Sequence, residues 1–568
     1  MRNISLEIVL FYFSLFSFLL PLSCPTSDSV THAFLECLEN HSQFSSYPIS
    51  GIICTPNNSS YPTVLQHYIR NLRYNMSTTQ KPLLILTPMH ESHIQSAITC
   101  AKTHSLQMKI RSGGHDYEGI SYWSEVPFFI LDMFNLRSIK VNIEDETAWV
   151  QAGATVGEML YKIAEKSNTH GFPVGVCPTM GVGGHLSGGG YGYLMRKYGL
   201  SVDNIVDAQL IDVNGRVLNR ETMGKDFFWA ITGGGASSFG VVLAYKIKLV
   251  RVPAKVTVFD VHRTLEQNAT EIVYRYQHVA HKLPKEIFIR LTMMVMNITE
   301  GNKKTINASF MSLFLGDSET LVSLMNKRFP ELGLKKKDCK EMSFVQSYIK
   351  WTNYALGTNC DIGAPKVLLN RAYNSTHLTR WHSSKSRYRP SGRSRTPQFQ
   401  KKKNSTHLKR KSDYLKEPIP KDGLEYICKR MIELEKPMLT FNPYGGKMAK
   451  ITPSAKPFPH RAGIICKIQY ATNWKENDVK ESEHYVNLTI MLHTYMTPFV
   501  SKPPREAYFN YRDLDLGINH NGHGSYFEGA AYGDKYFKHN FKRLVHIKTK
   551  IDPDNFFRHE QSIPTLPS

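Results

Sequence analysis

Long apolar runs are nearly absent from the sequence. The run at residues 8–22 lies close to the N-terminus and is shorter than the ~20 apolar residues that a membrane-spanning helix needs. Small and polar residues follow it, which is typical of a signal peptide, so we expect residues 1–27 to be removed during secretion. No later stretch approaches the length of a membrane helix, and the nine cysteines fit an oxidising compartment. These features predict a soluble, secreted protein without a membrane partner, glycosylated at sequons such as those at Asn268 and Asn487.

Acidic residues are absent from residues 379–403, which hold nine lysines and arginines. The same Asn-Ser-Thr-His-Leu sequence flanks this segment at residues 374–378 and 404–408. A Ser/Arg/Pro-rich segment cannot bury apolar area, so we expect a disordered insert. We interpret it as a retained intron or a gene-model error. The net charge of +22 therefore does not predict a nucleic-acid partner.

The sequence also lacks a Rossmann fingerprint, because no third glycine stands at its position and no βαβ unit frames the glycines. Glycine is nevertheless concentrated in two loops, at residues 111–119 and 175–192. Glycines let a ligand approach the backbone, and the exposed N–H groups of such loops can bind a pyrophosphate. Glycine content alone fits a flexible structural loop as well as a nucleotide site.

Two reactive side chains favour the nucleotide site. His115 ends the sequence Arg-Ser-Gly-Gly-His in the first loop, and Cys177 stands in Gly-Val-Cys-Pro-Thr in the second. A metal site at His115 and His185 has no acidic or cysteine partner at ligand spacing. From about residue 34 to residue 564 the chain resembles the berberine bridge enzyme-like (reticuline oxidase-like) family of plant FAD-linked oxidoreductases. Residues 325–333 are similar to the cannabinoid acid synthases.

The resemblance implies FAD attached to both His115 and Cys177. Imidazole nitrogen and thiolate are both nucleophiles toward an electron-poor ring, so these attachments are chemically reasonable. It also implies a disulfide between Cys37 and Cys100. The residues expected to bind the cofactor are Arg111, Ser112, Gly113, Gly114, His115, Asp116, Cys177, Thr179, Gly181, Val182, Gly183, Gly184, His185, Ser187, Gly188, Gly190, Tyr191, Gly192, Val241, Asn510 and Tyr511.

A substrate hydroxyl that loses hydride needs a base for its proton. Alternation along the strand expected at residues 465–470 places Lys467 and Gln469 on one face. By resemblance, Tyr191, Lys467 and Tyr511 match a family base motif, while Tyr117 and Gln469 line the substrate pocket. We expect Tyr511 to be the base, with Lys467 as the cation that stabilises its phenolate.

The order of elements predicts an α+β protein. Short strands and helices mix in residues 28–253 (core 78–253), and longer alternating strands with helices on one face occupy residues 254–500. By resemblance, residues 501–568 return to the first part. The two together form a discontinuous FAD-binding domain of the vanillyl-alcohol oxidase type, and residues 254–500 form the substrate domain.

Two local patterns are specific enough to check. Thr155 and Glu158 predict a capping box at the start of a helix. Asn214-Gly215, between apolar strands, predicts a type I′ hairpin turn.

We therefore expect a secreted monomer, in the extracellular space, cell wall or vacuole, that oxidises a hydroxylated small molecule. The substrate candidates are a monolignol-like alcohol, a carbohydrate hydroxyl, and a phenolic or alkaloid. Met180 replaces a valine or leucine that influences oxygen access in the family, so oxidase and dehydrogenase stay open, with O2 as a candidate partner. Thr232, Ala236 and Lys450 are further departures from the family pattern. They keep the alternative of a flavin-less, inactive or ligand-binding glycoprotein open.

Overall fold

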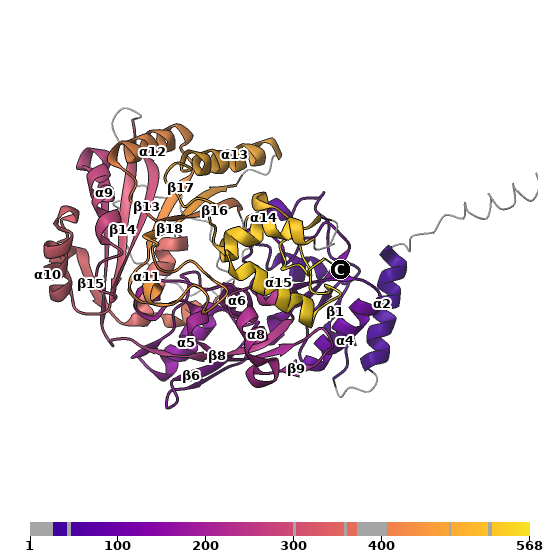
Figure 1. The fold of residues 1–568 in the computed structure, drawn as a ribbon. Coiled ribbons are helices and arrows are strands. Elements are labelled where there is room, and N and C mark those ends of the chain that lie inside the picture. The colour runs from indigo at the N-terminus through magenta and orange to yellow at the C-terminus, as the bar shows by residue number, and fades with distance from the viewer. Residues whose placement is uncertain are drawn as a thin grey trace, which may run out of the picture.

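The computed structural model describes residues 27–42, 47–298, 303–356, 361–371, 406–475, 479–520 and 525–567. The expected signal peptide and the basic segment 379–403 lie outside these residues, apart from residue 27 at the end of the signal. Figure 1 shows two lobes, with the C-terminal helices packed against the lobe that the N-terminal half of the chain forms.

The N-terminal lobe contains a small mixed sheet with the strand order β1-β2-β4-β3. Strands β2, β4 and β3 are parallel, and β1 is antiparallel to β2. The elements are α2 (Ser27–Ser42), β1 (Ile53–Cys54), α3 (Tyr61–Gln66), β2 (Ile85–Leu86), α4 (Glu91–Thr103), β3 (Gln107–Arg111) and β4 (Phe128–Asp132). Strand β3 ends at Arg111 and so delivers the first glycine loop from a fixed strand end.

A second, antiparallel sheet has the order β5-β6-β10-β8-β9. Its elements and neighbours are β5 (Ile139–Asn142), β6 (Thr147–Gln151), α5 (Val156–Lys166), β7 (His170–Gly171), α6 (Val182–Ser187), α7 (Met195–Tyr198), β8 (Ile205–Ile211), β9 (Val217–Leu218), α8 (Arg220–Ile231), β10 (Val241–Lys248) and β11 (Val250–Arg251). The capping box is confirmed, because Glu158 N donates to Thr155 Oγ1 at 3.2 Å and Thr155 N donates to Glu158 Oε2 at 2.8 Å.

The type I′ prediction at the β8–β9 turn is wrong. A type I′ turn needs positive φ at both central residues, whereas only Gly215 (φ 74°) is positive here and Asn214 is not. The Asp212 carboxylate explains the difference, since Oδ1 accepts from Asn214 N at 3.0 Å and Arg216 N at 2.9 Å. This side-chain cap stabilises a longer turn that places its single left-handed residue at the glycine.

The second lobe contains a large antiparallel sheet with the order β15-β12-β14-β13-β17-β18-β16. Helices α9, α12 and α13 cover one face, where apolar strand residues pack against them (Figure 1). The elements are β12 (Val256–Thr264), α9 (Ala269–Val279), β13 (Ile287–Asn297), β14 (Lys304–Phe314), α10 (Ser318–Arg328), β15 (Cys339–Met342), α11 (Phe344–Leu356), β16 (His407–Leu415), α12 (Lys421–Leu434), β17 (Met438–Pro443), β18 (Cys466–Trp474) and α13 (Val479–Tyr495). The opposite face is left for the junction with the first lobe.

The C-terminal segment returns to the first lobe. It contains the short 3-10 turns η11 (Phe509–Tyr511) and η12 (Leu514–Leu516) and the helices α14 (Tyr526–Phe537) and α15 (Asn540–Ile551). Apolar residues of α14 and α15 share one hydrophobic core with the first 250 residues, and α15 contacts α8. The α+β fold with a discontinuous first domain is thus confirmed. Among the described residues, no helix is both long and apolar enough to cross a membrane.

A disulfide between Cys37 and Cys100 joins α2 to α4, as predicted. Replacing both cysteines by alanine should lower the free energy of unfolding by about 2–4 kcal/mol, because the cross-link restricts the unfolded chain. Denaturant unfolding with and without reductant measures this. Reductant should destabilise the wild type and leave the double variant unchanged. A Cys54→Ala variant, which removes a buried free thiol, should keep its sensitivity to reductant.

Candidate active site

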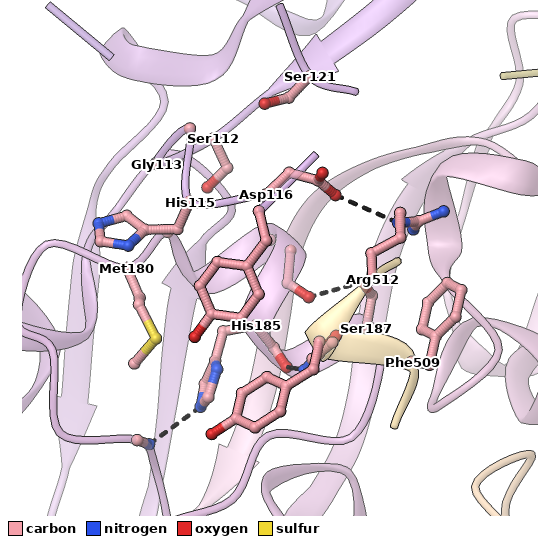
Figure 2. A pocket seen from close by; sticks show the side chains of 18 of the residues that line it. Ser112, Gly113, His115, Asp116, Ser121, Met180, His185, Ser187, Phe509 and Arg512 are labelled. Carbon is pink, nitrogen blue, oxygen red and sulfur yellow. Dashed lines mark hydrogen bonds and ion pairs between the residues drawn. The ribbon is translucent and has the colours of Figure 1, made fainter. Parts of the chain in front are cut away.

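A cavity of ≈ 330 Å³ lies at the junction of the two lobes and the C-terminal segment. Its walls come from both glycine loops, from the open face of the large sheet and from residues 508–512. Figure 2 shows His115, Met180 and His185 on one side and Asp116 and Arg512 on the other. The size is in the range of small-molecule sites.

The two glycine loops contact each other backbone to backbone. A Cβ atom at Gly113 would lie 2.2 Å from Gly181 N, and one at Gly181 would lie 2.1 Å from Ser112 Oγ. Gly114 has φ 64°, and a Cβ there would meet Tyr68 O at 2.1 Å. A side chain at Gly113 or Gly181 would force the two loops apart, and one at Gly114 would displace the backbone of Tyr68. The glycines therefore set how closely the two reactive side chains approach.

Gly184 is different, because a Cβ at this position would meet nothing within 4 Å. The residue is exposed into the cavity at the start of α6. Open backbone at a glycine beside a cavity fits a planar or phosphorylated ligand that must touch the main chain.

Most of the predicted cofactor residues line the cavity: Ser112, Gly113, Gly114, His115, Asp116, Cys177, Gly181, Gly183, Gly184, His185, Ser187, Tyr191, Asn510 and Tyr511. Seven of the predicted residues do not line it: Arg111, Thr179, Val182, Gly188, Gly190, Gly192 and Val241. Arg111 pairs with Asp132 at 2.6 Å and anchors the end of β3. On β10, Val242 lines the cavity, whereas the predicted residue Val241 does not.

His115 is held by a residue of the second loop. Its Nε2 lies 2.8 Å from Thr179 Oγ1, which leaves Nδ1 outside this hydrogen bond. Burial, with a contribution from Arg70, lowers the pKa of His115 well below its usual value, so the ring is neutral. A neutral imidazole keeps a lone pair for reaction with an electron-poor ring.

Cys177 lies in the wall of the cavity beside these groups. Burial raises the pKa of its thiol to about 11, although the charges of Arg290, Arg410 and Arg70 act in the opposite direction. The resting thiol is therefore protonated. Bond formation at this sulfur needs loss of that proton, which the nearby guanidinium groups favour.

The predicted base residues form one aromatic cluster. The hydroxyls of Tyr191 and Tyr511 share a short hydrogen bond. Lys467 Nζ lies 3.0 Å from the ring centroid of Tyr191 and 4.2 Å from that of Tyr511. Tyr508, which the sequence analysis missed, completes the cluster at 3.9 Å from the same ammonium. Its hydroxyl accepts from Gly190 N at 3.1 Å, which joins the cluster to the second glycine loop.

Burial, and then the charge of Arg290, lowers the pKa of Lys467 well below its usual value. Burial raises the pKa of Tyr511 well above its usual value, while Arg290 opposes that rise at both Tyr511 and Tyr191. Arg290 thus adds a charge that favours a phenolate, beside the role that we expect of Lys467.

Two arginines of the large sheet escaped the sequence analysis. Arg290 on β13 and Arg410 on β16 line the cavity while remaining 8% and 6% exposed. Arg290 Nε donates to Asn442 Oδ1 at 2.9 Å, and Arg410 lies 5.6 Å from the ring of Tyr117. Within the described residues, no carboxylate forms an ion pair with either arginine. Alternation along β16 could have indicated Arg410. It stands between Lys409 and Lys411, so its side chain lies on the opposite face of the strand from theirs.

The predicted substrate residues meet directly. Gln469 Nε2 donates to the Tyr117 hydroxyl at 3.0 Å, which joins the large sheet to the first glycine loop. Arg512 Nε pairs with Asp116 Oδ2 at 3.2 Å, and the buried His559 also lines the cavity. Sequence reasoning missed Arg512 and His559.

Comparisons with known proteins identify the relatives of this chain. Residues 82–220 match the family model of an FAD binding domain, and residues 507–564 match the model "Berberine and berberine like". Berberine bridge enzyme-like 8 of Arabidopsis thaliana is 53% identical over 95% of this chain and 96% of its own. Tetrahydroberberine oxidase of Berberis wilsoniae is 46% identical over 98% of both chains. The structure of Phl p 4, a grass pollen allergen with glucose dehydrogenase activity, has a TM-score of 0.82 and 38% identity, covering 94% of this chain and 100% of its own.

The residues present fit FAD. The open backbone at Gly184, which we call the cradle, is accessible to a ligand. The close contact of Gly113 with Gly181 brings the loops of His115 and Cys177 together. The Asp116–Arg512 pair and Tyr191, Tyr508 and Tyr511 line this same cavity.

Alanine at Gly184 tests this fit. Because its methyl group would enter open space, Gly184→Ala should fold normally but bind less flavin, since the methyl group occupies the cradle. Gly113→Ala, whose Cβ overlaps backbone, should instead reduce the yield of folded protein. Flavin absorbance per folded protein, together with the unfolding temperature, separates the two effects. Wild-type flavin content in Gly184→Ala would contradict the cradle.

Proposed function

The chain belongs to the berberine bridge enzyme-like family of FAD-linked oxidoreductases, and from that premise we propose that it is a secreted enzyme that oxidises a hydroxylated small molecule, with FAD held covalently by His115 and Cys177. The observation that carries the proposal is the shared cavity. It brings both reactive side chains together with the hydrogen-bonded hydroxyls of Tyr191 and Tyr511.

FAD, when bound, accepts the hydride that the substrate carbon loses. His115 and Cys177 would hold it, and the backbone at Gly184 would contact it. The protein's remaining task is to remove the proton of the substrate hydroxyl. We infer that Tyr511 does this, and its support is the hydrogen bond of its hydroxyl to that of Tyr191, which can accept or return a proton.

Arg290 supplies the positive charge that such a base needs. Its guanidinium favours the phenolate of Tyr511 and of Tyr191. Lys467 is stacked against three tyrosine rings, and burial and the charge of Arg290 lower its pKa, so it can exchange a proton with a phenolate that forms beside it. Arg290 thus adds a second positive charge to the one that we expect of Lys467.

Tyr117 and Gln469 present a hydroxyl and an amide that can orient a substrate hydroxyl. Arg290 and Arg410 give this end of the cavity a positive charge, which disfavours a cationic amine. One relative is named a tetrahydroberberine oxidase and one structural neighbour a glucose dehydrogenase. Of these two kinds of substrate, we propose that a neutral or anionic polyhydroxylated compound fits the cavity better than a protonated alkaloid.

Met180 lines the cavity, so its side chain is in a position to influence which electron acceptor reaches FAD. A variant of Phl p 4 is described as a glucose oxidase, whereas the wild type is a glucose dehydrogenase. We expect Met180 to influence whether O2 or another molecule is the electron acceptor of this chain.

The three departures from the family pattern are accommodated. Thr232 Oγ1 donates to Phe228 O at 2.9 Å and accepts from Lys456 Nζ at 3.1 Å. Ala236 lies in the cavity wall, and Lys450 is exposed to solvent. None of the three blocks the cavity. A yellow protein whose colour survives acid precipitation would support the enzyme over a flavin-less glycoprotein.

The attachment of FAD is tested by removing its anchors. His115→Ala and Cys177→Ala should each keep flavin bound after acid precipitation, because the other covalent link remains. The double variant should release it. Absorbance of the supernatant and pellet measures the outcome. Flavin retained by the denatured double variant would mean that another residue forms the link.

The base is tested by the rate of anaerobic flavin reduction. Tyr511→Phe should lower this rate by about 10²–10⁴-fold, the usual contribution of general-base catalysis, while keeping the fold and the flavin. Tyr193→Phe is a matched control, since its buried hydroxyl has no hydrogen-bond partner in the described part of the chain. It should reduce flavin at the wild-type rate.

The pH profile tests Arg290. A base acts when deprotonated, so the rate rises as pH rises through its pKa. Because Arg290 lowers the pKa of Tyr511, Arg290→Met should move this rising limb to higher pH. If the rising limb of the pH profile of Arg290→Met stays at the wild-type pH, Arg290 does not lower the pKa of the base.

A further inference from the structure

A network of charged side chains lies behind the cavity wall, where three parts of the chain meet. Lys409 Nζ on β16 contacts Glu118 Oε1 at 2.8 Å, Asp513 Oδ1 at 2.9 Å and Asp515 Oδ1 at 3.0 Å. Lys411 Nζ contacts the second oxygens of Asp513 at 2.6 Å and Asp515 at 2.7 Å. The network therefore joins the first glycine loop, the large sheet and the C-terminal segment.

Each part of the network is next in sequence to a residue of the cavity wall. Glu118 follows Tyr117 in the first glycine loop, and Asp513 comes two residues after Tyr511 in the C-terminal segment. On β16, alternation places Lys409 and Lys411 on one face and Arg410 on the other, where it lines the cavity. The ion pairs thus hold the backbone directly behind three side chains of the active site.

The charges in the network balance. Arg73 adds a third cation, with NH1 at 3.3 Å from Glu118 Oε2, against the three carboxylates. Lys409, Glu118 and Asp513 have side chains that are only 1–3% exposed. Removing one partner of a buried ion pair leaves an uncompensated charge, so such groups resist separation. The network therefore resists movement of any one of the three segments.

We propose that Lys409 is a positioning residue for the oxidation. By binding Glu118 and Asp513 with one ammonium group, it fixes the first glycine loop and the C-terminal segment against β16. The rings of Tyr117 and Tyr511, whose centroids lie 5.4 Å apart, thereby keep their relative positions across the cavity. The catalytic consequence rests on the proposed function of Tyr511, whereas the structural consequence does not.

A residue that only stabilises the fold would act differently. Arg505 provides the comparison, because it also joins β16 to the C-terminal segment, through Asp413 Oδ1 at 2.7 Å from its Nε. Neither of these residues, nor any sequence neighbour of theirs, lines the cavity. Loss of Arg505 should lower stability without moving the tyrosines.

The experiment compares Lys409→Met, Lys409→Arg and Arg505→Met as holoenzymes. The first readout is the visible circular dichroism of the bound flavin, which reports the asymmetry of its surroundings without turnover. The second is the rate of anaerobic flavin reduction against pH, and the third is the unfolding temperature. A displacement of a reacting group by about 1 Å can lower a rate about 10²-fold.

Lys409→Met should change the visible circular dichroism and lower the reduction rate by about 10- to 100-fold, the order that such displacement produces. Lys409→Arg, which can still bridge two carboxylates, should restore most of both. Arg505→Met should lower the unfolding temperature and leave both flavin readouts unchanged. The proposal is overturned if Lys409→Met changes only the unfolding temperature, or if Arg505→Met alters the flavin readouts equally.

If Lys409→Met does not fold, Glu118→Gln replaces it in the experiment. This substitution removes one charge of the network while keeping the shape of the side chain, and it should produce smaller changes in the visible circular dichroism and in the reduction rate. Unchanged flavin readouts in a folded Glu118→Gln would then overturn the proposal. If no hydroxylated compound reduces the wild-type flavin, the proposed function fails, while the visible circular dichroism still decides whether Lys409 positions the cavity wall.

Discussion

The site depends on one steric constraint, the contact between the backbones of the two glycine loops. Gly113 and Gly181 approach so closely that a single Cβ on either would overlap main-chain or side-chain atoms of the other loop. This contact brings His115 within reach of Thr179 and places the loop of Cys177 beside it. A larger residue at Gly113 or Gly181 would separate His115 from Cys177, which are 62 positions apart in the sequence. These two side chains therefore lie together only because glycine is present at both positions.

Closure of this junction takes titratable groups out of water, and burial then controls their protonation. Burial moves the pKa of His115 and Lys467 downward and that of Cys177 and Tyr511 upward, so each resting group is driven toward neutrality. Arg290 opposes this at Cys177 and Tyr511, since a guanidinium keeps its charge when buried. The cavity thus combines buried groups whose charged forms are disfavoured with the fixed positive charge of Arg290.

The large sheet supplies the substrate side of the cavity through its register. Asn442 pairs with Lys467, and Thr440 pairs with Gln469, so the polar side chains of β17 and β18 form rows on one face. Arg290 joins the first row through its bond to Asn442. The opposite face carries the apolar residues that pack against the helices. A shift of one residue would exchange these faces, so the apolar core also fixes which side chains reach the active site.

The sequence by itself determined the two glycine loops and the placement of Lys467 and Gln469 on one face, because motifs and alternation are local properties that neighbours in the chain express directly. The order of its elements predicted the α+β fold class. The disulfide partners followed from the resemblance to the family, since spacing alone does not assign cysteine pairs. Sequence reasoning failed at the β8–β9 turn, where the side chain of Asp212 competes with the preference of Asn-Gly. It also missed Arg290, Arg410, Tyr508 and Arg512. Only the tertiary structure decided that these side chains meet at one cavity, since contacts between residues that are distant in the chain depend on how the two lobes and the C-terminal segment pack.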